Sequence, residues 1–169
     1  MSLVEKISFK MMSFYHETLY SLFRDPHAVL KKAGLEKGQK VLEVGCGPGF
    51  FTIPAADIVG SSGSLHVIDI NPYAVEHVQK KIDASGMDNI ELSQSDASDM
   101  GVDSGSFNNI FVFGLARAKG EGFDAIWPEL HRVLKEDGVL AIEGRIKPPE
   151  KLFRPEKNEG RIARFAKTP

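Results

Sequence analysis

The sequence contains one cysteine, Cys46, among its 169 residues. A single thiol can form neither an internal disulfide nor a metal site made of cysteines. The five histidines include no pair at a spacing typical of metal ligands, so we predict that the protein binds no metal. A lone thiol is typical of proteins in a reducing compartment, which predicts a cytoplasmic location.

Long apolar runs and an excess of positive charge are missing as well. No stretch approaches the roughly 20 apolar residues that cross a bilayer, so we expect no membrane span. Residues 1–12 mix charged with apolar side chains and lack the apolar core of a signal peptide. The net charge of -2 argues against a dedicated nucleic-acid binder, which usually carries a strongly basic face.

The chain does contain short apolar runs that alternate with longer helical patterns. This alternation is typical of a parallel sheet covered by helices on both faces. We therefore predict an α/β fold, a three-layer sandwich with a mostly parallel central sheet. The strands are expected at residues 40–44, 64–70, 89–93, 107–115 and 139–143, and the helices at 26–32, 50–59, 72–85 and 123–135.

The length of 169 residues suits one domain, and we predict a single domain over 1–169. Within it, residues 1–36 would form an N-terminal helical cap, 37–145 the core, and 146–169 a pair of short strands. About 25 residues follow Gly144, fewer than the roughly thirty that a helix between two strands needs. The C-terminal part is therefore expected to be shortened, with its helix reduced or absent.

Residues 43–49, with the sequence EVGCGPG, stand between the first expected strand and the following helix. Glycines at such a turn let a ligand approach the main chain and open a helix N-terminus towards it. The dinucleotide fingerprint G-x-G-x-x-G would need a third glycine at position 50, which is Phe50, and this disfavours a nicotinamide dehydrogenase. A plain strand-to-helix turn, with glycines that serve only packing, is the alternative.

The alternating glycines of this segment, behind an acidic residue, resemble the first motif of the class I (Rossmann-like) S-adenosylmethionine-dependent methyltransferases. The resemblance covers roughly residues 28–145 and implies a Rossmann-like core similar to that of quinone and other small-molecule methyltransferases. It implies S-adenosylmethionine as cofactor and S-adenosylhomocysteine as product. In that family the loop lines the methionine end of the cofactor, which assigns Gly45, Cys46 and Gly47 to cofactor binding. Glu43 matches the acidic residue near the cofactor's amino end.

Asp69 stands at the end of the second expected strand, 24 positions after Gly45. A carboxylate there can accept hydrogen bonds from both hydroxyls of a ribose. The alternative role for Asp69 is to cap the next helix, but Asn71 suits that role better. Residues 66–72 also resemble the second motif of the family, which implies that Ile70 lies against the adenine.

Three more residues are assigned by their places in the resemblance. Asp96 and Ala97 follow the third expected strand, where an acidic residue of the family accepts from the adenine amino group. Asp99 competes with Asp96 for that role, and an exposed loop carboxylate is the alternative for either one. Phe113, near the end of the fourth strand, would present its backbone carbonyl towards the cofactor's amino group.

The sequence identifies no definite catalytic residue. Methyl transfer from a sulfonium is an in-line displacement that needs a general base only when the acceptor keeps its proton. In this architecture the acceptor lies over the carboxyl ends of the strands. Tyr15 and His16 are the candidates for contacting it, and Tyr20, Arg117 and Lys119 are further candidates.

The function that these patterns predict is an enzyme, a methyltransferase acting on a small-molecule acceptor. The basic residues between Arg145 and Lys167 leave open a methyltransferase acting on protein or RNA, although a charge run is usually a solvated face. The shortened C-terminal part leaves open a non-catalytic subunit that only holds the cofactor. It also leaves open an acceptor site completed by a second copy, in a homodimer, or by another partner.

Overall fold

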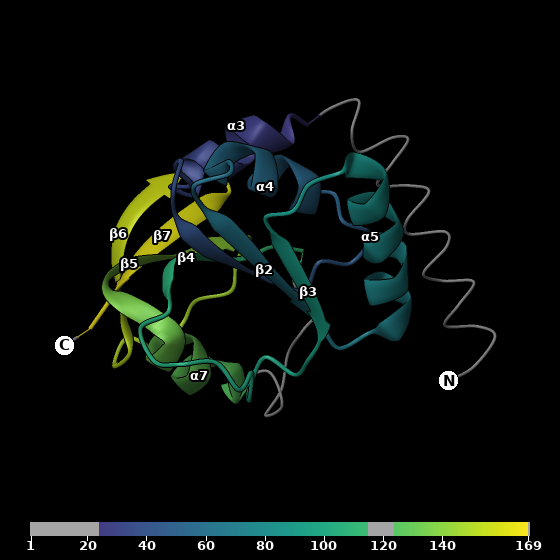
Figure 1. The fold of residues 1–169 in the computed structure, drawn as a ribbon. Helices are drawn as coiled ribbons and strands as arrows, with labels where there is room; N and C mark the ends of the chain where they lie inside the picture. Colours follow the sequence, from purple (N-terminus) through teal and green to yellow (C-terminus); the bar gives the residue numbers. More distant parts are fainter. Residues whose placement is uncertain (1–23, 115–123, 169) are drawn as a thin grey trace.

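The computed structural model describes residues 24–114 and 124–168, which form a seven-stranded sheet with helices on both faces (Figure 1). The helices are α3 (Pro26–Lys32), α4 (Thr52–Val59), α5 (Pro72–Ser85) and α7 (Ile126–Val133). The strands are β1 (Lys40–Val44), β2 (Ser64–Asp69), β3 (Ile90–Gln94), β4 (Phe107–Val112), β5 (Leu134–Glu143), β6 (Phe153–Glu159) and β7 (Ile162–Lys167).

The strands lie in the order β3-β2-β1-β4-β5-β7-β6. The pairs from β3 to β5 are all parallel, and β7 runs antiparallel to both β5 and β6. The predicted α/β fold with a mostly parallel sheet is therefore confirmed. Because β2 lies on one side of β1 and β4 on the other, the strand order reverses beside β1. Sheets of this kind bind ligands outside the carboxyl ends of the strands at such a switch point.

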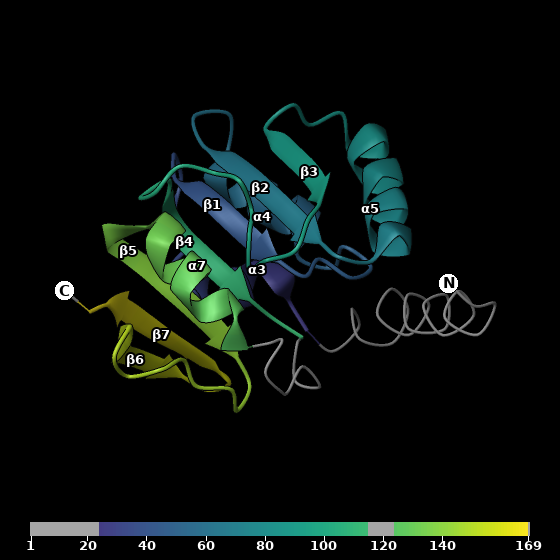
Figure 2. The same ribbon diagram turned by 90° about the horizontal axis from the view of Figure 1, so that it is seen from below.

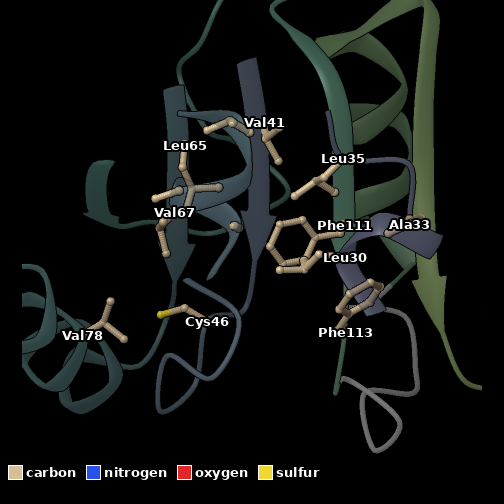
Figure 3. Close-up of a cluster of buried hydrophobic side chains, with 14 of the residues drawn as sticks. Leu30, Ala33, Leu35, Val41, Cys46, Leu65, Val67, Val78, Phe111 and Phe113 are labelled. Atoms are coloured by element: carbon tan, nitrogen blue, oxygen red, sulfur yellow. The ribbon is translucent and has the colours of Figure 1, made fainter. Parts of the chain in front are cut away.

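Helices cover the two faces of the sheet unequally (Figure 2). Apolar side chains of α3, α4 and α5 pack on one face in a first buried cluster, part of which is drawn in Figure 3. On the other face α7 packs in a second cluster. Neighbouring residues of β1 divide between them, since Val41 lies in the first cluster and Leu42 in the second. No helix within 24–114 or 124–168 is long and apolar enough to cross a membrane.

Two helices begin at side-chain caps, and one of these, Asn71, is predicted from the sequence. At the start of α3, the side chain of Asp25 accepts from the N–H of His27 at 2.9 Å. At the start of α5, the side chain of Asn71 accepts from the N–H of Tyr73 at 3.0 Å. Gly86 ends α5 in the left-handed region with φ of 68°.

Several predicted element boundaries were wrong, among them the end of β4, which stops at Val112 rather than at residue 115. Two of the differences have a clear physical reason. α4 begins at Thr52 rather than at residue 50, because the turn that contains the glycines continues through Phe51. β5 begins at Leu134, where the sequence predicted a helix to residue 135 and then a turn. Leu134 pairs with Phe107 of β4, and this pairing extends β5 across the expected turn with a register shift between the two parts.

The connection after β5, residues 144–152, contains no helix. Ile146 and Leu152 of this connection pack against the second cluster, on the face that carries α7. β6 and β7 then form an antiparallel hairpin at the edge of the sheet. In β6, residues 154–158 are all exposed, and the pairing register shifts beside Pro155.

Candidate functional site

The glycine loop, residues 45–49, lies at the carboxyl end of β1, where the strand order reverses. The N–H of Gly45 donates to the carbonyl of Ile68 in β2 at 2.8 Å. Gly45, Gly47 and Gly49 all have positive φ, a region that residues with a side chain rarely adopt. The loop therefore turns sharply between β1 and α4 while it stays bonded to β2.

Two glycines of this loop are required for different reasons. A Cβ added to Gly47 would have nothing within 4 Å, so this turn faces open space. A Cβ added to Gly49 would lie 2.9 Å from Cγ2 of Val78, so α5 packs directly against this glycine. Gly47 thus leaves the main chain accessible to a ligand, while Gly49 allows the helix to approach the loop.

Asp69, the last residue of β2, lies against the glycine loop. Its Oδ2 accepts from the N–H of Gly47 at 2.9 Å, and its Oδ1 accepts from the N–H of Asn71 at 2.8 Å. The Sγ of Cys46 lies 3.7 Å from the same Oδ2. The cap of α5 is the side chain of Asn71. The carboxylate of Asp69 is therefore held at the loop rather than used as the helix cap.

Glu43 is the buried carboxyl group of the site. It is 2% exposed, and its Oε2 accepts from the hydroxyl of Thr52 at 2.7 Å. Burial raises the pKa of Glu43 to about 8, an increase that the Thr52 hydrogen bond opposes and the carboxylate of Asp69 adds to. Glu43 is therefore mostly protonated at neutral pH. Thr52 was not predicted from the sequence, although a hydroxyl residue at the start of the helix after an acidic strand end is the signal that could identify it.

Cys46 contributes its side chain to the core. The thiol belongs to the first buried cluster, where Figure 3 shows it with Val67 and Val78. Burial raises the pKa of this thiol, and the nearby carboxyl groups of Glu43 and Asp69 raise it further. The thiol therefore stays protonated, and Cys46 can meet a ligand only through its main chain.

Ile70 follows Asp69 at the carboxyl end of β2 and points away from the core. Its exposed fraction is 67%, and no other large apolar side chain in the described part of the chain is exposed. An apolar side chain gains free energy when a ligand covers it. Ile70 is therefore available to contact an apolar ligand group beside Asp69.

The loop after β3 joins the same region through its backbone, since the N–H of Ser95 donates to the carbonyl of Asp69 at 3.2 Å. Asp96 is exposed, and its Oδ1 accepts from the N–H and the hydroxyl of Ser98 at 2.9 and 2.8 Å. These hydrogen bonds hold the pKa of Asp96 below its ordinary value. Ala97 packs against the second cluster. The loop thus carries an exposed carboxylate, Asp96, directly after the residue that is hydrogen-bonded to Asp69.

Phe113, the residue after β4, belongs to a cluster of aromatic rings. Its ring centroid lies 5.0 Å from that of Phe51 and 5.1 Å from that of Phe111. The guanidinium of Arg24 lies 5.4 Å from the centroid of the Phe51 ring. Because the side chain of Phe113 is buried, its main-chain carbonyl is the group that it can offer to a ligand.

An ion pair that the sequence did not predict joins the segment before α3 to the end of β5. The Nη1 of Arg24 lies 2.6 Å from Oε1 of Glu143, the last residue of β5, and the Nε of Arg161 lies 3.5 Å from the same oxygen. The side chain of Glu143 is only 6% exposed. The pair joins residues from opposite ends of the sequence, neither of which belongs to a motif, so no local signal identifies it.

The residues predicted to bind the cofactor follow strands that are neighbours in the sheet. β1, β2, β3 and β4 are parallel, so the segments after them meet at one edge. Tyr15 and His16, predicted to contact the acceptor, lie outside the described residues, as do Tyr20, Arg117 and Lys119. The residues at the shared edge are Glu43, Gly45, Cys46, Gly47, Asp69, Ile70, Asp96, Ala97 and Phe113.

Comparison with known proteins finds similarity to methyltransferases. Residues 35–148 match the family model described as a methyltransferase domain. The chain is 31% identical over 127 residues to demethylmenaquinone methyltransferase of Staphylococcus aureus (strain MRSA252), covering 75% of this chain and 51% of that protein. It is 42% identical over 71 residues to aklanonic acid methyltransferase of Streptomyces sp. (strain C5), covering 42% of this chain and 32% of that protein.

The fold is also found among solved structures. A SAM-dependent methyltransferase from Aquifex aeolicus superimposes with a TM-score of 0.73 at 24% identity, covering 94% of this chain and 95% of that one. At 24% identity, this similarity shows that the two proteins share a fold. By contrast, the chain spans about half the length of the demethylmenaquinone methyltransferases that it matches.

Proposed function

The chain belongs to the methyltransferase domain family, and on this basis we propose that it binds S-adenosylmethionine and transfers the methyl group to a small-molecule acceptor. The observation that carries the proposal is the position of Asp69, whose carboxylate accepts from the N–H of Gly47 in the glycine loop. An acidic side chain and an open turn are thereby held together at the switch point of the sheet.

The described residues fit an adenosine group linked to an amino acid. The space beside Gly47 is open, and Ile70 offers exposed apolar surface next to Asp69. Each carboxylate oxygen has more than one lone pair, so Asp69 can keep its backbone donors while it accepts from ribose hydroxyls. Asp96 is ionised at neutral pH and can accept from an adenine amino group.

The proposed roles divide between the two ends of the cofactor. We assign the adenosine end to Asp69, Ile70, Asp96 and Ala97. We assign the amino-acid end to Glu43, Gly45, Cys46, Gly47 and Phe113. The first set follows β2 and β3, and the second belongs to β1, its loop and the end of β4. Each end is thus held by a different pair of strands.

The proposed mechanism requires the chain to orient the cofactor and the acceptor more than to transfer protons. When bound, S-adenosylmethionine supplies a methyl group that its sulfonium has already activated. The chain's residues must hold the acceptor atom in line with that group and exclude water. The loop and Asp69 suit the part of this task that fixes the cofactor, because both belong to strand ends that are held by the sheet.

A small-molecule acceptor is favoured over protein or RNA. The relatives named above act on demethylmenaquinone and aklanonic acid, which are small molecules. The macromolecular alternative rests on residues 145–167, which hold eight Lys and Arg against three Glu. Half of these basic side chains form ion pairs with glutamates, which reduces the free positive charge, and they are Lys157, Arg161, Arg164 and Lys167.

Four further parts of the proposal concern the domain organisation, the absence of a metal, the location and the oligomeric state. We propose that residues 1–169 form one domain, and that the enzyme works without a metal in the cytoplasm, where the lone thiol of Cys46 suits the reducing conditions. A homodimer in which the partner copy completes the acceptor site is the last part. Sedimentation velocity at several concentrations tests it.

Isothermal titration calorimetry with S-adenosylmethionine, S-adenosylhomocysteine and NAD tests the cofactor. We expect the wild type to bind the first two and not NAD. Asp69→Ala should weaken both by about 10- to 100-fold, because it removes the charged acceptor of two hydrogen bonds. Asp57→Ala is the matched control, since Asp57 is an exposed carboxylate on α4 that pairs with His27. If the wild type binds neither S-adenosylmethionine nor S-adenosylhomocysteine, the proposal is overturned. If it binds them but methylates no acceptor in a broad panel, the non-catalytic alternative is favoured.

A further inference from the structure

The glycine loop is supported from outside by a helix that carries none of the residues assigned to the cofactor. Lys81 of α5 donates from its Nζ to the carbonyl of Pro48 at 2.8 Å. The Cδ of the same side chain would lie 3.5 Å from a Cβ at Gly49, where Val78 also packs. One turn of α5 therefore contacts two consecutive residues of the loop.

This support matters because the loop is rich in glycine. Glycine has a wide choice of backbone angles, so a segment with three glycines in five residues needs bonds from outside to keep one conformation. β2 supplies two such bonds, to the N–H groups of Gly45 and Gly47. Lys81 donates a charge-assisted hydrogen bond to a carbonyl of the loop, that of Pro48. The loop is thus fixed from β2 on one side and from α5 on the other.

We propose that Lys81 is a positioning residue, which orients the glycine loop for the amino-acid end of the cofactor. The inference rests on the proposed function. It assigns to Lys81 an effect that is confined to ligands carrying the amino-acid part, since adenosine is assigned to Asp69, Ile70, Asp96 and Ala97. Lys81 acts through the Pro48 carbonyl and does not itself have to touch the ligand.

The chain offers a matched control in the neighbouring lysine. Lys80 lies on the same helix, is 70% exposed, and pairs with Glu76 one turn earlier. Lys80→Met and Lys81→Met remove the same charge from the same turn of α5, but only the second removes the bond to the loop. Lys81→Arg keeps a donor that can reach a carbonyl.

Calorimetric titration with two probes tests the proposal. S-adenosylhomocysteine carries the amino-acid part, and 5′-methylthioadenosine lacks it. We expect Lys81→Met to weaken S-adenosylhomocysteine about tenfold and to change 5′-methylthioadenosine less than twofold, since a single charged hydrogen bond is lost. Lys81→Arg should recover affinity to within about threefold of the wild type, and Lys80→Met should leave both ligands unchanged.

Hydrogen exchange of the protein without ligand gives a second readout. Amides of residues 45–50 should exchange faster in Lys81→Met than in the wild type or in Lys80→Met, while amides of β4 should not change. Equal weakening of both probes would overturn the proposal, because it would show a general structural defect. Unchanged affinity for S-adenosylhomocysteine would overturn it too. A wild type that binds neither probe would instead overturn the proposed function, and the inference with it.

Discussion

The two halves of the sheet are built differently. In the half made of β3, β2, β1 and β4, helices α4 and α5 connect the first three strands, and the segments after the strands carry the residues assigned to the cofactor. In the half made of β5, β7 and β6, residues 144–152 connect without a helix and a hairpin ends the sheet. The second half contributes buried side chains such as Phe153 and Phe165.

This difference indicates that the residues assigned to binding after β2 and β3 are largely separate from the buried residues that stabilise the C-terminal half. The groups at the carboxyl ends of β2 and β3 are partly or fully exposed, as Asp69, Ile70 and Asp96 illustrate. Such groups add little to the core, whereas Phe153 and Phe165 of the C-terminal half are buried in the second cluster. Substitutions of buried residues in the C-terminal half should therefore lower stability and leave ligand affinity unchanged. Substitutions of the exposed residues after β2 and β3 should do the reverse.

The largest expected effect is on stability in the C-terminal half. Phe153 is 1% exposed and lies in the second cluster, so Phe153→Ala should lower the free energy of unfolding by about 3–5 kcal/mol. The affinity for S-adenosylhomocysteine should change less than twofold at a temperature where the variant is folded. Urea unfolding and calorimetry measure the two quantities. A loss of affinity above tenfold would show that the halves are not separate.

The next effect is on the pH dependence of stability and involves Glu43, a buried group in the first half of the sheet. Its pKa is about 8 in the folded protein against an ordinary value of 4.5, so between these values the folded state keeps a proton that the unfolded chain has lost. The stability linked to this proton is full below about pH 4.5 and is lost as the pH rises towards 8, by up to about 1.4 kcal/mol per pH unit. Glu43→Gln should flatten this dependence.

Urea unfolding at pH 5, 6.5 and 8 measures that dependence for the wild type and for Glu43→Gln. Glu36→Gln is the control, because Glu36 is an exposed carboxyl group in the connection before β1. If Glu43→Gln and the wild type lose stability in parallel from pH 5 to 8, Glu43 is not the group that holds the proton.

Ile70→Ala should show the reverse of the Phe153 result. Because Ile70 is 67% exposed, its truncation should change the free energy of unfolding by no more than about 0.5 kcal/mol. Affinity for S-adenosylhomocysteine should fall about five- to tenfold, since the ligand loses an apolar contact. The same two measurements apply. Unchanged affinity would remove Ile70 from the site.

The smallest effect separates the two acidic residues after β3. Asp96→Asn should weaken S-adenosylhomocysteine about threefold, as expected for a charged acceptor at an exposed position, and Asp99→Asn should leave the affinity unchanged. Calorimetry on the pair of variants gives the answer. The opposite ranking would assign the adenine amino group to Asp99 instead.

Local motifs made part of this structure predictable from the sequence. The glycine loop, Asp69 and the cap at Asn71 were found because each is a short pattern beside a strand end. The bond from Thr52 to Glu43 and the pair of Arg24 with Glu143 could not be found, since they depend on which side chains the fold brings together. The start of β5 was missed for the same reason: strand pairing overrode a helical pattern.

The edge strand β6 determines how this sheet meets other molecules. Pro155 stands within it, has no N–H to offer, and lies beside the register shift, with the exposed charges of Arg154 and Lys157 close by. An added strand would lack a donor at Pro155 and would strip water from those charges. The hairpin thereby resists strand addition at this edge of the sheet and the aggregation that follows from it.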